Sequence, residues 1–159
     1  MTNWKEPAEL NGYLERHVRL LLDSFRHWTG KDLVQQQQSS RDQARELFYA
    51  PFVVLSHDWG SDPLLNYANK AGLRLFELTW EELIALPSRL TAGPLHRDQR
   101  ARLLGQVTQQ GYIEDYTGVR ISRSGQRFLI EQATVWNVRD EQGTPYGQAA
   151  TFGRWRFLP

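Results

Sequence analysis

One acidic side chain stands in an otherwise apolar run of the sequence. Glu131 lies between Ile130 and Gln132 in the run RFLIEQATVWNV, where strand-forming residues predominate. A carboxylate at this place could face a pocket and bind a polar ligand atom, and burial would then raise its pKa. The alternative is a surface carboxylate paired with an arginine of a neighbouring strand, because acidic side chains are rarely fully buried.

Three further side chains are candidates for the same pocket. Asn69 could reach a ligand with its amide, although it is also well placed to cap the helix that follows it. Trp136 and Tyr116 could stack on a planar ligand, or they could pack across neighbouring strands as core residues. Both roles are open for each of these residues.

Two histidines occupy positions that deserve a test as ligands, because histidine is the commonest metal ligand. His57 ends an expected strand beside Asp58, and His96 begins an expected helix. Neither forms a metal-binding spacing with His17 or His27. An ordinary hydrogen-bonded or exposed histidine is the alternative in each case, and we predict no metal site.

A basic run surrounds the start of the same expected helix. It could hold an anion or the acidic face of a partner. Asp98 interrupts the run, so a solvated helix face is the alternative. Its members are Arg89, His96, Arg97, Arg100 and Arg102.

Composition and motifs exclude several kinds of chemistry. The chain has 159 residues and no cysteine, which removes disulfides, thiolate metal sites, cysteine nucleophiles and covalent flavin–cysteine adducts. Nucleophile-elbow, P-loop and dinucleotide-binding glycine motifs do not occur in the sequence. We therefore do not expect an enzyme. If the chain were one, Glu131 or His57 would be the candidate base.

Charge and hydropathy indicate a soluble globular protein. The net charge is +1, with 40% hydrophobic and 23% charged residues, so neither nucleic acid nor an anionic membrane is an expected partner. The start MTNWKEPAEL does not have the pattern of a signal peptide, and no apolar run approaches the roughly 20 residues that span a bilayer. We expect a cytoplasmic protein.

Helical periodicity dominates residues 1–50, which we interpret as an N-terminal helical extension. A second helix is expected from Ser40, with Gln43 completing a capping box and Pro51 following its end. Gly30 is the expected end of the first helix. The apolar face of that helix is indicated by residues three or four positions apart: Leu10, Leu14, Val18, Leu21, Phe25 and Trp28.

The pattern changes after Pro51. PFVVLSHD and LLNYAN predict two short strands, and WGSDP predicts the turn between them. Asn69 is expected to cap the next helix, and Thr79 with Glu82 forms a capping box for another. LHRDQRARLLGQVTQQG predicts a longer helix that ends at Gly111. Three strands follow, YIEDYTGVRIS, RFLIEQATVWNV and YGQAATFGRWRFL, and the short turns between them predict antiparallel pairing.

These elements predict an α+β domain over residues 51–159, with a five-stranded antiparallel sheet and helices on one face. The central strand carries apolar residues on both faces, so the second face also needs a cover. The N-terminal helix is the natural cover, packed on or beside the sheet. The two alternating sets are Phe128, Ile130 and Trp136 on one side, and Leu129, Ala133 and Val135 on the other.

The order of these segments resembles known families. From about Phe52 to Leu158, NKAGLRLFELTWEEL and SGQRFLIEQATVWNVRDEQGTPYGQAATF are similar to the corresponding segments of PAS domains. More closely, SHDWGSDPLLNYANKAGLRLFE, LPSRLTA, GYIEDYTGVRISRSGQRFLIEQATVWNV and GQAATF resemble the MEKHLA domain family, in the form of a stand-alone bacterial member. This PAS-related domain also forms the C-terminal end of class III homeodomain–leucine zipper factors of plants. The resemblance implies a PAS-like cup that binds a small molecule or pairs with a partner, and it implies no established chemistry.

Our leading hypothesis is a sensory module. The cup between sheet and helices would bind a small, partly apolar molecule and signal through association with a partner. Its ligand-binding residues would be Glu131, Asn69, Trp136, Tyr116 and His57. Haem or flavin is a variant of this hypothesis, and the lack of cysteine excludes only the covalent thiol–flavin form.

The alternative hypothesis is an interaction module without a ligand. Leu14, Val18, Leu21 and Phe25 would then be shared between packing on the sheet and a seam with a second copy, giving a homodimer. A heterologous signalling partner would be the other version of this hypothesis. An enzyme is the third and least supported hypothesis.

Overall fold

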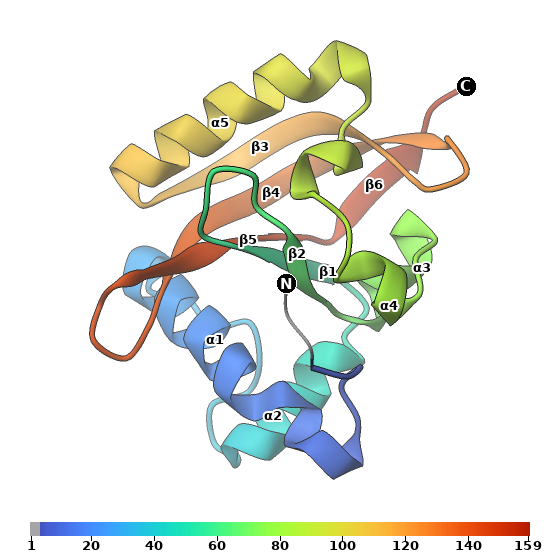
Figure 1. Ribbon diagram of the computed structural model, residues 1–159. Coiled ribbons are helices and arrows are strands. Elements are labelled where there is room, and N and C mark those ends of the chain that lie inside the picture. The colour runs from blue at the N-terminus through green and yellow to red at the C-terminus, as the bar shows by residue number, and fades with distance from the viewer. Residues whose placement is uncertain (1–3) are drawn as a thin grey trace.

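The computed structural model describes residues 4–159, and its helices lie on both faces of one antiparallel sheet (Figure 1). In chain order the elements are η1 (Glu9–Leu14), α1 (Glu15–Thr29), α2 (Ser40–Phe48), β1 (Val53–Asp58), β2 (Leu65–Ala68), α3 (Lys70–Phe76), α4 (Trp80–Leu83), η2 (Ser88–Thr91), η3 (Pro94–His96), α5 (Arg97–Gln110), β3 (Tyr112–Ile121), β4 (Arg127–Arg139), β5 (Pro145–Phe152) and β6 (Arg154–Phe157).

The sheet contains the five expected strands and one more. Its order is β2-β1-β5-β4-β3, and β6 pairs with β4. The last expected strand breaks at Gly153, so that β5 pairs with residues 134–139 of β4 and β6 pairs with residues 128–131. The prediction of a single final strand was therefore wrong, because one long strand, β4, takes two successive partners along the same edge.

A bulge in β4 changes which side chains share a face. Gln132 has a positive φ of 54°, and the pairing with β3 shifts between Tyr116 and Gly118. As a result Ile130 and Val135 face the same side of the sheet, whereas Trp136 faces the other side. The expected grouping of Trp136 with Ile130 was wrong, because an extra residue in a strand reverses the alternation.

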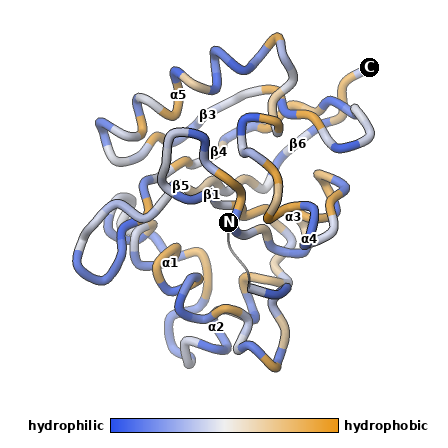
Figure 2. Tube along the Cα trace, viewed as in Figure 1, coloured by the Kyte–Doolittle hydropathy of each residue, from blue (hydrophilic) through white to orange (hydrophobic). Residues whose placement is uncertain are grey.

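The second face of the sheet is covered by α1, as expected. Phe25 packs against Trp136 with ring centroids 4.9 Å apart, and Val18 and Leu21 are buried in the same cluster. The opposite face is covered by α5, whose Leu103 and Val107 are buried. Figure 2 shows hydrophobic and hydrophilic residues alternating along both helices, as on helices with one buried face.

The first helix begins later than its periodicity indicated. Gly12, Tyr13 and Leu14 have positive φ angles of 61°, 57° and 58°, so the chain turns sharply and α1 starts at Glu15. Leu10, placed on the buried face by its spacing, is fully exposed in this turn. The end of the helix is confirmed, because Gly30 adopts the left-handed conformation and its amide donates to the Arg26 carbonyl.

Helix caps were predicted with mixed success. The N-cap of α2 is Ser39, which accepts from the Asp42 amide, so the capping box from Ser40 to Gln43 was wrong. The Gln43 side chain is buried and accepts from Arg19 instead. The Asn69 cap of α3 and the capping box of Thr79 with Glu82 are confirmed.

The proposed boundary at residue 50 stays a prediction. Leu21, Leu47 and Tyr67 belong to one buried cluster, so the segments before and after this boundary share a core. None of the helices within residues 4–159 is long and apolar enough to cross a bilayer.

Candidate functional site

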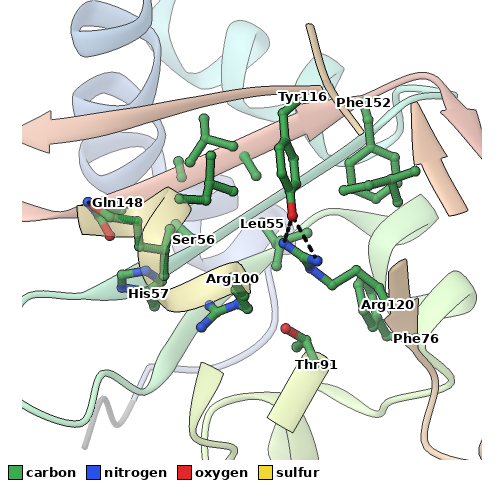
Figure 3. A pocket seen from close by; sticks show the side chains of 16 residues that line it. Leu55, Ser56, His57, Phe76, Thr91, Arg100, Tyr116, Arg120, Gln148 and Phe152 are labelled. Carbon is green, nitrogen blue, oxygen red and sulfur yellow. Dashed lines mark hydrogen bonds between the residues drawn. The ribbon is translucent and has the colours of Figure 1, made fainter. Parts of the chain in front are cut away.

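A partly enclosed cavity lies between the sheet and α5 (Figure 3). Its volume is about 40 Å³, which is room for about three water molecules. Side chains of β1, β3, β4, β5 and α5 form its walls. The apolar part of the lining includes Leu55, Phe76, Leu103, Ile130, Val135 and Phe152.

Strand β3 supplies a linked pair of polar groups to this cavity. Both terminal nitrogens of Arg120 donate to the Tyr116 hydroxyl, over 3.3 and 3.4 Å, and one of them also donates to the Val119 carbonyl over 2.9 Å. Arg120 is only 8% exposed. Residues 116, 118 and 120 alternate along the strand toward the same face, so the cavity receives both side chains.

Gly118 makes this pair possible. A β-carbon at residue 118 would overlap the Tyr116 ring, so only glycine lets the ring lie along the strand toward Arg120. We predict that Gly118→Ala displaces the Tyr116 ring and lowers the free energy of unfolding by about 1–3 kcal/mol, as overpacking does. Urea unfolding and the NMR shifts of the Tyr116 ring protons measure the two effects.

The control for this substitution is Gly105→Ala. Gly105 is exposed on α5 with no atom near the position of an added β-carbon, so alanine there should stabilise the helix by about 0.5–1 kcal/mol. Unchanged Tyr116 shifts in the Gly118→Ala protein would show that the ring does not depend on this glycine.

His57 faces the cavity with an unused acceptor. Its Nδ1 lies 2.7 Å from the Asp58 carbonyl oxygen, and since a carbonyl only accepts, Nδ1 carries the proton. Nε2 is buried and has no hydrogen-bond partner within residues 4–159. Burial lowers the pKa of His57 to about 4, with a contribution from the Arg100 charge, and the hydrogen bond to the Asp58 carbonyl and the nearby Gln148 side chain oppose this shift. The imidazole is therefore neutral near pH 7.

The charge of the cavity is unbalanced. Arg100 of α5 also lines it, and no Asp or Glu of the described chain does. In that same part of the chain, neither Arg100 nor Arg120 forms a salt bridge. Burial, with the neighbouring charge of Arg120 as a smaller cause, lowers the pKa of Arg100 to about 10. The Arg100 guanidinium therefore remains charged at neutral pH.

Two of the five predicted ligand residues, His57 and Tyr116, line the cavity. Trp136 does not, because it lies on the other face of the sheet, where its Nε1 donates to the Leu21 carbonyl over 3.2 Å. Glu131 is outside the cavity and forms a 3.5 Å ion pair with Arg156 of β6. The surface pairing that was the alternative for Glu131 is thus the arrangement found.

Asn69 is a structural residue in this fold. It is fully buried, and its side chain makes four hydrogen bonds to backbone groups. Its amide is therefore saturated and takes no part in the cavity.

The predicted dimer seam lies inside the chain. Val18, Leu21 and Phe25 are buried against the sheet, and Leu14 is half-buried beside them. The first three side chains therefore have no surface left for a second subunit. That part of the interaction prediction was wrong, because the same apolar face that suggested a seam is the face that covers the sheet.

The basic run separates into one cavity residue and a solvated face. Arg100 points inward, whereas Arg102 is exposed and Arg89 pairs with Asp62 over 3.2 Å. His96 lies half-buried in η3. No group of three potential metal ligands among His, Asp and Glu occurs within residues 4–159.

Sequence reasoning missed Arg120 and Gln148. Arg120 follows Tyr116 by four residues in an expected strand, a spacing that places both on one face. This alternation could have identified it. Gln148 lines the cavity and donates from Nε2 to Asn137 Oδ1 over 3.0 Å and to Thr108 Oγ1 over 3.1 Å. No local pattern in the sequence indicates that Gln148 lines a cavity.

Comparison with known proteins identifies a domain model and plant relatives. A model of the MEKHLA domain matches residues 15–157. Homeobox-leucine zipper protein HOX32 of Oryza sativa is 30% identical over 167 residues, covering 96% of this chain and 19% of HOX32. ATHB-9 of Arabidopsis thaliana is 33% identical over 101 residues, covering 62% of this chain and 12% of that protein.

This chain thus spans about a fifth or less of the length of these curated relatives. Because they are plant proteins, the expected bacterial stand-alone type is not supported.

Solved structures with similar folds are PAS and light-oxygen-voltage domains. The PAS domain of a Colwellia psychrerythraea protein has a TM-score of 0.62 at 16% identity, covering 74% of this chain and 95% of that one. A light-oxygen-voltage domain studied with a flavin analogue has a TM-score of 0.58 at 15% identity, covering 74% and 85%. An RNA-binding light-oxygen-voltage receptor has a TM-score of 0.60 at 17% identity, covering 78% and 36%. The predicted PAS-like α+β fold is confirmed.

Proposed function

This chain belongs to the MEKHLA domain family, and we propose that it is a sensory module whose cavity binds a small, partly apolar molecule. One observation carries the proposal: largely apolar walls enclose a space that is lined by a buried polar atom without a partner in the described chain, His57 Nε2. Buried polar atoms are normally hydrogen-bonded, so His57 Nε2 indicates a place for a ligand atom or water. Pockets of this mixed character are typical of small-molecule sites.

The size of the cavity limits the ligand. At about 40 Å³ it is far below the roughly 300–1,000 Å³ of pockets for drug-sized molecules. A flavin, as studied in one fold neighbour, does not fit among the side chains present, and neither does a haem. The proposed ligand has only a few non-hydrogen atoms.

We propose binding and not catalysis, although one nucleophile–base pair exists. Ser56 Oγ lies 3.1 Å from His17 Nε2, as in hydrolytic sites. The Ser56 hydroxyl, however, donates to Asn66 Oδ1 over 2.6 Å, so its oxygen accepts from His17. A base that donates to the hydroxyl oxygen cannot take its proton. This geometry favours a structural hydrogen-bond chain.

The output we propose is association with a partner when the cavity fills. The helix α5 carries Arg100, Leu103 and Leu104 on the cavity wall and polar residues on its outer face. A ligand that binds between this helix and the sheet would stabilise one position of α5. The partner would then bind to the outer face of that helix.

A cavity-filling variant tests ligand binding. Ala150 lines the cavity from β5, so Ala150→Leu should fill it, whereas Ala101→Leu adds the same atoms on an exposed turn of α5. We expect compounds from a panel of small metabolites to raise the melting temperature of the wild-type and Ala101→Leu proteins only. Equal shifts in Ala150→Leu would show that the compounds bind elsewhere, and no shift in any protein would contradict the proposal.

A further inference from the structure

Two arginines from different elements meet at the cavity. Arg100 comes from the helix that covers the sheet and Arg120 from strand β3. Figure 3 shows Arg100 between His57 and Arg120, with the Arg120 guanidinium directed at the Tyr116 hydroxyl. Besides burial, the positive charge of Arg120 is one cause of the lowered pKa of Arg100, so the two charges oppose each other.

Other arginines without an acidic partner in the described chain, such as the exposed Arg102, are solvated, whereas Arg100 and Arg120 line a cavity. In the described part of the chain an acidic partner is present for each member of a set of outward-facing arginines: Arg16, Arg19, Arg26, Arg41, Arg89, Arg123 and Arg156. Arg100 and Arg120 have none there, and because Arg120 is buried and Arg100 is partly buried, water offsets their charges less than at the surface. Two like charges in a region of low dielectric destabilise a fold unless a counter-ion offsets them.

The hydrogen-bonding groups around the pair suit an anion. A guanidinium presents parallel N–H donors that match the two oxygens of a carboxylate. The Tyr116 hydroxyl accepts from Arg120, so its own proton is free to be donated to a ligand oxygen. Arg100, Arg120 and Tyr116 thus all line one small space.

The remaining walls suit a carbon chain. Leu55, Ile130, Val135 and Phe152 enclose the other side of the cavity, where an inorganic anion would lose hydration without compensation. We propose that the ligand is a short-chain organic carboxylate, held by its anionic group between Arg100 and Arg120 with its carbon atoms against these apolar walls. This inference rests on the proposed function of the cavity and names the chemical class of its ligand.

Matched pairs of small molecules test the charge requirement. Propionate and propionamide have nearly the same shape but differ in charge, and inorganic phosphate supplies charge without a carbon chain. In titrations followed by ¹H–¹⁵N NMR of the arginine Nε–H groups, propionate should shift the signals of Arg100 and Arg120. We expect its Kd to be at least tenfold lower than that of propionamide or phosphate, since hydrogen bonds to charged groups are the stronger ones.

Arginine variants show which side chains bind propionate. Arg100→Gln and Arg120→Gln should each weaken propionate binding at least tenfold, whereas Arg102→Gln on the exposed face of the same helix should leave the Kd unchanged. Equal affinity for propionate and propionamide would overturn the carboxylate and leave a neutral ligand for the cavity. The proposal would also be overturned if phosphate bound more tightly than propionate, or if propionate did not bind. An equal loss of propionate affinity in Arg102→Gln would overturn it as well.

A measurement without any ligand tests the same electrostatics. Because Arg100 is held beside a second positive charge, Arg100→Met should raise the melting temperature of the ligand-free protein by about 2–4 °C, the shift expected for a modest gain in stability of a chain of this size. Arg102→Met should not change it. A lower melting temperature for Arg100→Met would mean that this charge is already compensated, which overturns the inference.

Discussion

Replacing Asn69 with alanine should lower the free energy of unfolding by about 4 kcal/mol, because four backbone groups would lose their partner. Its Oδ1 accepts from the Val54 amide over 3.0 Å and the Gly72 amide over 3.1 Å. Its Nδ2 donates to the Leu47 carbonyl over 3.0 Å and the Phe52 carbonyl over 2.8 Å. One side chain thereby ties together the end of α2, the start of β1 and the start of α3. The loss corresponds to a melting temperature lower by roughly 8–16 °C.

Ser39→Ala is the matched control, since Ser39 also caps a helix but makes one exposed hydrogen bond to the Asp42 amide. It should lower the free energy of unfolding by only about 1 kcal/mol. Urea unfolding of both variants gives the comparison. If Asn69→Ala were no more harmful than Ser39→Ala, the amide would not organise these three elements.

The protein should lose about 4 kcal/mol of stability between pH 7 and pH 5, through two buried histidines. Burial is the main cause that lowers the pKa of His17 to about 3 and that of His57 to about 4. The charge of Arg16 contributes to the first value, and the charge of Arg100 contributes to the second. Both would titrate near 6.5 in the unfolded chain. The unfolded chain therefore binds more protons below that pH, so stability is present above about pH 6.5 and is lost as the pH falls toward 4.

The hydrogen bonds of His17 explain why its neutral form is required. Nδ1 lies 3.1 Å from the Tyr146 hydroxyl and Nε2 lies 3.1 Å from Ser56 Oγ. Because the Ser56 proton is directed to Asn66 Oδ1, Nε2 donates and Nδ1 accepts from Tyr146. A second proton on the ring would place two donors between the ring and Tyr146.

Unfolding in urea at pH 7, 6 and 5 measures this loss. His17→Gln and His57→Gln should each remove about half of the pH dependence, whereas His27→Gln, an exposed position on the same helix as His17, should leave it in place. A stability that stays constant from pH 7 to 5 in the wild-type protein would contradict the buried, neutral state of both rings.

Local signals in the sequence predicted most of the fold. Asn69, Thr79 with Glu82, and Gly30 act within one helical turn, so their roles could be inferred without tertiary structure. The order of strands around the middle helices was also readable, because turn residues separate the apolar runs. The late start of α1 was not, since the left-handed conformations of Tyr13 and Leu14 are unusual for residues with side chains.

The candidate site could be predicted only in part, because it depends on the register of strands. The bulge at Gln132 reverses the alternation within β4, so Trp136 leaves the face that carries Ile130. Glu131 finds Arg156 only because β6 folds back along β4. The cavity residues Arg100 and Arg120 lie 20 positions apart and meet through the packing of α5 on the sheet, which no local pattern shows.

The central claim is that this cavity holds a small ligand. The most direct measurement is the native mass spectrum of the protein freshly purified from the cells that produce it, compared with that of the Ala150→Leu variant. We predict an adduct of low mass on the wild-type protein, with one ligand per chain, that is absent from the variant. Wild-type protein at its apo mass, or an adduct equally abundant on both proteins, would contradict a ligand in this cavity.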